Sequence, residues 1–249
     1  MSGHSKWSSI KHQKGVTDAR RGQLFTKLAR EIIVAVREAG SNSEANFRLR
    51  LAIQKARDNN MPLDNIERAI KRGSGQLEGA NLVEMVLEGY GVGGVAILVQ
   101  ALSDNRNRTL QNVRNIFFRH GGNLGESGCV AWLFDLRGLI TIETSALDAE
   151  ELALNAIDAG AEDVKIENNY IEIYTKPEEL EKVRGVLEQK NLPIASAELS
   201  MVPKNVVELE EKAALQTLRL LDKLEELDEV QHVSSNADFS DSILEKYQS

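Results

Sequence analysis

The sequence has little cysteine, few aromatic side chains and no long apolar run. Its 249 residues include a single cysteine, Cys129, which excludes an internal disulfide framework and a metal cluster built from several cysteines. Aromatic residues make up only 5% of the chain. The longest apolar stretch, Val95 to Leu102, is much shorter than the roughly 20 residues of a membrane-spanning helix. The first 20 residues lack the apolar segment of a secretory signal, so we expect a cytoplasmic protein without a membrane partner.

Motifs for common chemistries are also missing. Gly89 to Gly94 spell G-x-G-x-x-G, but the apolar run that follows is typical of a strand, so a glycine-rich hairpin is favoured over a dinucleotide site. The chain has no P-loop and no H-x-x-x-H, and Ser127 lacks the G-x-S-x-G context of a nucleophile. Cys129 stands in an apolar segment, which favours a buried structural thiol in a strand. We therefore expect no enzyme activity, metal, cofactor or small-molecule substrate.

What the sequence does have is a sharp charge asymmetry. Residues 1–73 carry 15 Lys/Arg and 7 Asp/Glu, a net charge of +8, whereas residues 74–249 carry 15 and 31, a net charge of −16. A basic face on an acidic chain still attracts phosphate within about one Debye length, ~8 Å at physiological salt. This favours a nucleic-acid partner, with contact to backbone and shape rather than stacking, because residues 1–73 contain few aromatics. The alternative is that the basic helices present ordinary solvated faces.

The basic part of the chain divides into an arm and a helical domain. Residues 1–16 have neither helical nor strand periodicity and predict a flexible basic arm. Residues 17–75 predict three short helices with apolar residues inward and basic residues outward. The candidate nucleic-acid contacts are the cations of these two segments: Lys6, Lys11, His12, Lys14, Arg20, Arg21, Lys27, Arg30, Arg37, Arg68, Lys71 and Arg72.

Beyond a linker at Gly73–Gln76 the periodicity changes from helical to alternating, and we expect an α+β fold. Residues 138–202 predict the order βαββαβ of a ferredoxin-like domain, with a tight turn at Asn168-Asn169. We expect residues 234–249 to be only weakly attached to the rest of the fold. The predicted organisation is a three-helix domain at 17–75, an α+β domain formed by 80–134 with 203–240, and an inserted ferredoxin-like α+β domain at 135–202. In the α+β domain formed by 80–134 and 203–240, we expect strands at 82–88, 95–102, 129–134 and 230–233 and helices at 105–119 and 208–226.

One further segment could bind an anion. The sequence DNRNRT places Arg106 and Arg108 at a predicted helix start, where Ser103 or Asp104 is the expected cap. Unpaired N–H groups at a helix start point towards a bound anion, so one interpretation of this segment is a phosphate or carboxylate site. An ordinary cap with exposed arginines explains the pattern equally well.

Four segments together resemble the YebC/PmpR family. They are GHSKWSSIKHQKGVTDARRGQLFTKLAREI, NMPLDNIERAIKRG, GYGVGGVAILVQALSDNRNRT and GGNLGESGCVAWLFD, in family order between Gly3 and Asp135. Two positions depart from the usual family pattern, Val92 for a common proline and Cys129 for a common serine. The resemblance implies a three-domain cytoplasmic protein, with a helical N-terminal domain and two α+β domains around a central cleft.

The resemblance also implies a role in gene expression, and it leaves the target open. Family members are described as probable DNA-binding transcriptional regulators, which makes a non-enzymatic regulator bound to DNA our leading hypothesis. Mitochondrial relatives resemble translational activators and bacterial ones are linked to ribosomes, so the alternative is a translation factor that contacts ribosomal RNA through the basic domain and ribosomal proteins through its acidic part. A third hypothesis is an enzyme with a small-molecule site near Arg106 and Arg108.

Overall fold

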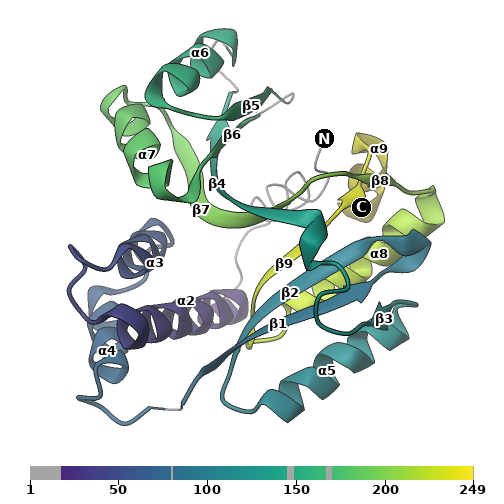
Figure 1. The fold of residues 1–249 in the computed structure, drawn as a ribbon, viewed down its shortest axis with the longest axis horizontal. Coiled ribbons are helices and arrows are strands. Elements are labelled where there is room, and N and C mark those ends of the chain that lie inside the picture. Colours follow the sequence, from purple (N-terminus) through teal and green to yellow (C-terminus); the bar gives the residue numbers. More distant parts are fainter. Residues whose placement is uncertain (1–17, 80, 145–148, 167–169, 249) are drawn as a thin grey trace. The chain divides into compact units, whose positions relative to one another are not determined.

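The computed structural model describes residues 18–79, 81–144, 149–166 and 170–248 (Figure 1). The chain divides into two compact units, Met1–Phe134 with Pro203–Ser249, and Asp135–Val202. Both contain helices and antiparallel strand pairs, which confirms the predicted α+β class. Among the helices of the described ranges, none combines the length and the apolar composition of a membrane span.

The first unit begins with the predicted three-helix bundle. Its helices are α2 (Asp18–Ala39), α3 (Phe47–Asp58) and α4 (Leu63–Gly73). Their apolar faces meet in one core that includes Ile32, Val36, Leu49 and Ile66, all buried. The second helix starts at Phe47 and not near Ser43, because the side chain of the buried Asn46 caps it. Its Oδ1 accepts the Leu49 N–H at 3.0 Å, and its Nδ2 donates to two backbone carbonyls.

A four-stranded sheet of order β3-β1-β2-β9 forms the rest of this core. Its strands are β1 (Val83–Tyr90), β2 (Ala96–Ser103), β3 (Asn123–Leu124) and β9 (Val230–Ser235). Helices α5 (Arg106–Arg119) and α8 (Glu211–Glu225) cover one face of the sheet (Figure 1). Apolar side chains of the sheet, such as Val99, pack there against Phe117 of α5 and Leu221 of α8.

The glycine-rich segment between β1 and β2 is a hairpin turn, as the sequence predicts. It contains the short 3₁₀ turn η1 (Val92–Gly94), in which Gly93 and Gly94 have φ of 76° and 77°. The Gly91 N–H donates to the Val95 carbonyl oxygen at 2.7 Å and closes the turn. Because a strand follows the glycines in place of a helix, the N–H cradle of a dinucleotide site is not formed.

Two predictions about the first unit are wrong. Residues 129–133 are not a strand, and the strand begins only at Phe134. Residues Ala131–Leu133 form the 3₁₀ turn η2 because the Glu88 carboxylate accepts N–H groups of this loop. The C-terminal residues are not loosely tied. They form β10 (Ala237–Asp238), which pairs with β8 (Val207–Glu208), and α9 (Asp241–Gln248). Phe239, Ile243 and Leu244 are buried in the core, which fixes this segment.

The second unit has the predicted order βαββαβ. Its strands are β4 (Phe134–Glu143), β5 (Asp163–Ile166), β6 (Tyr170–Thr175) and β7 (Ile194–Pro203), and its helices are α6 (Ala149–Ala159), η3 (Pro177–Glu179) and α7 (Leu180–Gln189). The sheet order is β5-β6-β4-β7, the arrangement of two interleaved βαβ units. The predicted turn at Asn168-Asn169 lies outside the described residues.

Candidate nucleic-acid interface

The predicted contact residues of the arm lie outside the described part of the chain. These are Lys6, Lys11, His12 and Lys14. Arg20 lies in the first turn of α2, but its side chain is likewise outside the description. The candidate interface is therefore built from the remaining cations of α2 and α4, together with the start of α5.

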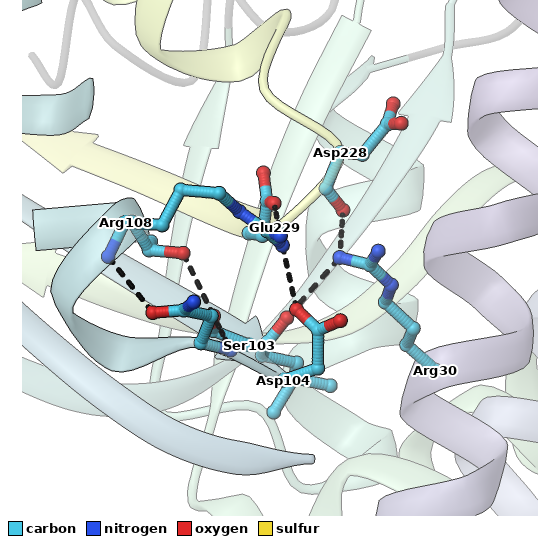
Figure 2. Close-up of polar contacts among 9 residues, drawn as sticks. Arg30, Ser103, Asp104, Arg108, Asp228 and Glu229 are labelled. Atoms are coloured by element: carbon cyan, nitrogen blue, oxygen red, sulfur yellow. Dashed lines mark hydrogen bonds and ion pairs between the residues drawn. The ribbon is translucent and has the colours of Figure 1, made fainter. Parts of the chain in front are cut away.

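Two cations of α2 bind carbonyl oxygens of the sheet region of the same unit. The Lys27 Nζ donates to the Glu225 carbonyl oxygen at the end of α8 (2.5 Å). The Arg30 NH1 group donates to the carbonyl oxygen of Leu102 (3.2 Å) and to that of Asp228 (2.9 Å; Figure 2). Carbonyl groups at a helix C-terminus attract cations, so Lys27 stabilises the end of α8. Both side chains thus join the bundle to the sheet.

Two further cations of α2 are exposed and have interactions. The Arg37 NH1 group donates to the Asn81 Oδ1 at 3.2 Å. Arg21 is exposed in the second turn of the helix and is engaged with another group. The stripe of α2 cations predicted from the helical wheel is therefore largely occupied by contacts within the protein.

The cations of α4 are placed differently. Ile66 and Ala69 face the bundle core, and this orientation leaves Arg68, Lys71 and Arg72 exposed on the outer side. Arg68 and Arg72, together with Arg30 of α2, line a hollow of about 520 Å³. Three of the predicted cations, one on α2 and two on α4, therefore line one concavity, whereas Lys71 does not line it.

The hollow has both polar and apolar walls. Apolar side chains of α2 and α4 form part of it, among them Phe25, Ile33 and Ala69. Thr26 and Asn65 add uncharged polar groups to the lining, and Glu78 and Asp104 add two carboxylates. The Arg30 NH1 group is already engaged, but its Nε and NH2 donors have no hydrogen bond to a described residue. A group with several acceptor oxygens, such as a phosphate, matches the three guanidinium groups.

The start of α5 is built around an ion-pair network. Asn105, and not Ser103 or Asp104, caps the helix, because its Oδ1 accepts the Arg108 N–H at 3.0 Å. The Arg108 NH2 group pairs with Asp104 at 2.6 Å and Glu229 at 3.0 Å (Figure 2). Hydrogen bonding to Glu229 and the charge of Asp104 raise the pKa of Arg108 above its usual value. An anion at this helix start must compete with two carboxylates for Arg108, while Arg106 is exposed and makes no ion pair with a described residue.

Two charged residues with structural roles were not singled out from the sequence. Arg48 of α3 bonds Glu31 (2.9 Å) and Glu38 (2.8 Å) of α2 and Glu84 (2.5 Å) of β1. Burial disfavours its charge, but Glu31 and the other carboxylates outweigh burial and raise the pKa of the guanidinium. The spacing of Glu31 and Glu38 on one helix gives no sign of a partner on another, so only tertiary structure brings this cluster together.

Glu88 is the second. This carboxylate is 4% exposed and accepts the N–H groups of Gly128 (2.6 Å), Val130 and Ala131 (both 2.8 Å). Burial alone would raise its pKa, but the three donors outweigh it and lower the pKa. In the loop that Glu88 holds, Cys129 is half-buried and not in a strand. Burial and the charge of Glu88 raise the pKa of the thiol, which keeps it protonated.

These features define an α+β protein whose N-terminal helical bundle carries clustered arginines around a hollow. The described residues contain no group of three or more His, Cys, Asp or Glu side chains placed to hold a metal ion. Residues 5–76 match the family model described as "TACO1/YebC protein N-terminal domain", and residues 82–237 match "TACO1/YebC second and third domain". The chain belongs to the TACO1/YebC family.

Several relatives match this chain over nearly its whole length. A probable transcriptional regulatory protein of Dehalococcoides mccartyi is 62% identical over 249 residues, 100% of this chain and 99% of that protein. A probable transcriptional regulatory protein of Natranaerobius thermophilus is 53% identical over 248 residues, 98% and 99% of the two chains. The crystal structure of a conserved hypothetical protein, Aq1575 from Aquifex aeolicus, has a TM-score of 0.83 and 47% identity, covering 92% of this chain and 98% of that chain. The names of the relatives support a regulatory role in general.

Proposed function

We propose that the protein is a non-enzymatic regulator of gene expression that binds nucleic acid through its helical bundle. The observation that carries the proposal is the convergence of Arg30, Arg68 and Arg72 on one hollow, in the part of the chain with a net charge of +8. Guanidinium groups bind phosphate oxygens in pairs, and a concave cationic surface concentrates the field on a polyanion. The arm cations Lys6, Lys11, His12 and Lys14 would add contacts to the same backbone.

Promoter DNA is the first candidate target, since the relatives are named probable transcriptional regulatory proteins. Ribosomal RNA is the second, and the charge distribution favours it. A net charge of −16 in residues 74–249 repels a duplex that wraps around the protein, but it is compatible with basic ribosomal proteins. Crosslinking in cells, followed by sequencing of the attached RNA and DNA, distinguishes the two. Recovery of neither would contradict the proposal.

The direct test is binding of the purified chain to duplex DNA and to structured RNA as a function of salt. If about five phosphates are neutralised on a duplex, the logarithm of the association constant falls with the logarithm of salt concentration at a slope near −4.5. The double variant R68E/R72E should weaken binding on the order of tenfold or more and flatten that slope by about two units. A salt-independent affinity would sink the proposal.

A matched control is Arg57→Glu. Arg57 is also an exposed arginine of the bundle, on α3, but it does not line the hollow. The same charge reversal should therefore have a clearly smaller effect on affinity than Arg68→Glu alone. Equal losses from Arg57→Glu and Arg68→Glu would mean that general charge, and not the hollow, governs binding.

A further inference from the structure

Helix α5 is basic although it lies in the acidic part of the chain. Its only charged residues are Arg106, Arg108, Arg114 and Arg119, and it contains no aspartate or glutamate. Its remaining polar side chains are mostly amides. A surface helix of an acidic protein would ordinarily carry charges of both signs. The purely positive charge of α5 therefore indicates a negatively charged partner.

The outer face of α5 combines arginines, amides and one aromatic ring. Val113 and Phe117 are buried in the core, which turns Gln111, Arg114, Asn115, Phe118 and Arg119 outwards. The Phe118 side chain is 82% exposed, more than any other large apolar side chain of the described residues. Arg114 lies one helical turn before Phe118 and Asn115 three residues before it, so both are its neighbours on the surface. Arg114 and Arg119 make no ion pair or hydrogen bond with a described residue.

Cations of α8 lie near the C-terminal end of α5. The Gln216 Nε2 donates to the His120 carbonyl oxygen at 3.0 Å and joins α8 to the end of α5. Lys223 and Arg219 of α8 lie close enough to act on His120. Burial and then these charges, with Arg119, lower the pKa of His120, so that it is neutral at pH 7. Arg219 is exposed, and Lys223 pairs with Glu226 at 2.6 Å.

We propose that the outer face of α5, formed by Gln111, Arg114, Asn115, Phe118 and Arg119, binds an unpaired stretch of RNA. Arginines supply contacts to phosphates, and an exposed ring supplies a platform on which an unstacked base lies. Amide groups both donate and accept hydrogen bonds, which suits base edges and the ribose 2′-hydroxyl. In a duplex the bases are already stacked, and Phe118 would gain nothing from it. The inference rests on the proposed function and specifies the kind of strand.

The test is binding of the full chain to a short, unstructured, fluorophore-labelled RNA, followed by fluorescence anisotropy. Phe118→Ala should weaken binding about tenfold, because stacking of a base on an aromatic side chain contributes on that order. Phe118→Leu should lose as much although it stays apolar, and Phe118→Trp should retain affinity. Since Phe118 is almost fully exposed, circular dichroism should show an unchanged Tm. The control is Leu154→Ala, an exposed apolar residue of α6 (64% exposed), which should change nothing.

Three results would overturn the inference: unchanged affinity of Phe118→Ala, full affinity of Phe118→Leu, or equal affinity for a DNA strand of the same sequence. The variant R68E/R72E keeps this outcome separate from that of the proposed function. If R68E/R72E weakens nucleic-acid binding and Phe118→Ala does not, the bundle is an interface and α5 is not. If neither variant weakens binding, both proposals fail.

Discussion

The two sides of the helical bundle use the same residue type for different purposes. On the side where α2 and α3 meet β1, Arg48 is surrounded by Glu31, Glu38 and Glu84. On the outer side of α4, Arg68 and Arg72 face a hollow and form no hydrogen bond or ion pair with a described residue. Desolvated cations with partners stabilise a fold, whereas solvated ones cost little stability and stay available for an external anion. The net charge of the bundle therefore overstates the charge that a ligand meets.

The largest effect on stability is expected from Arg48→Ala. The substitution removes the partner of three carboxylates and leaves them close to one another, so the free energy of unfolding should fall by about 3 kcal/mol. Affinity for nucleic acid, measured well below the lowered Tm, should not change. Urea unfolding measures the free energy of unfolding, and fluorescence anisotropy measures the affinity for nucleic acid. A loss of affinity with intact folding would show that Arg48 belongs to the interface.

The second-largest effect on stability is expected from Glu88→Gln. The free energy of unfolding should fall by about 2 kcal/mol, because an amide replaces a carboxylate that accepts three N–H groups. The pKa of Glu88 is lower in the folded state than its ordinary value of 4.5. The carboxylate therefore contributes stability above pH 4.5, and that contribution is lost as the pH falls through the folded-state pKa. Urea unfolding should show the full difference in the free energy of unfolding between the unchanged protein and Glu88→Gln at pH 7. This difference should become smaller below pH 4.5. A pH-independent difference would contradict this role.

Much of this organisation is local and could be predicted from the sequence. The exposure of Arg68, Lys71 and Arg72 follows from the position of Ile66 on the opposite side of a short helix, so a helical wheel is enough. The glycine turn before β2 and the order βαββαβ are local as well. Each depends on residues that are close in the sequence.

What failed depends on contacts that are distant in the sequence. Arg30 lies on the predicted basic stripe, but its NH1 group binds the carbonyl oxygen of Asp228, 198 residues further along the chain. Glu88 holds a loop 40 residues away, which explains why Ala131–Leu133 form the turn η2 and not a strand. The C-terminal segment is polar on average, and only the packed structure shows that Phe239 and Leu244 complete the core. No periodicity in a short window carries such information.

Arg30 combines both uses of arginine and should show an intermediate effect. Arg30→Ala removes two hydrogen bonds to carbonyl oxygens, for a loss of about 1 to 2 kcal/mol in the free energy of unfolding. It also removes one of the three arginines that line the hollow, so affinity for nucleic acid should fall as well. Denaturant unfolding and salt-dependent binding are the measurements. If stability falls while affinity and its salt slope stay unchanged, Arg30 is a purely structural residue.

The smallest and most discriminating effect is expected from two neighbours on α4. Lys71→Gln and Arg72→Gln remove the same charge one residue apart, but only Arg72 lines the hollow. Both side chains are exposed, so each variant should change the free energy of unfolding by less than about 0.5 kcal/mol. If the hollow holds a phosphate, Arg72→Gln should lower the salt slope by about one unit and Lys71→Gln by much less. Equal slopes would indicate that a diffuse positive potential attracts the nucleic acid and that the concave placement of the arginines has no part in it.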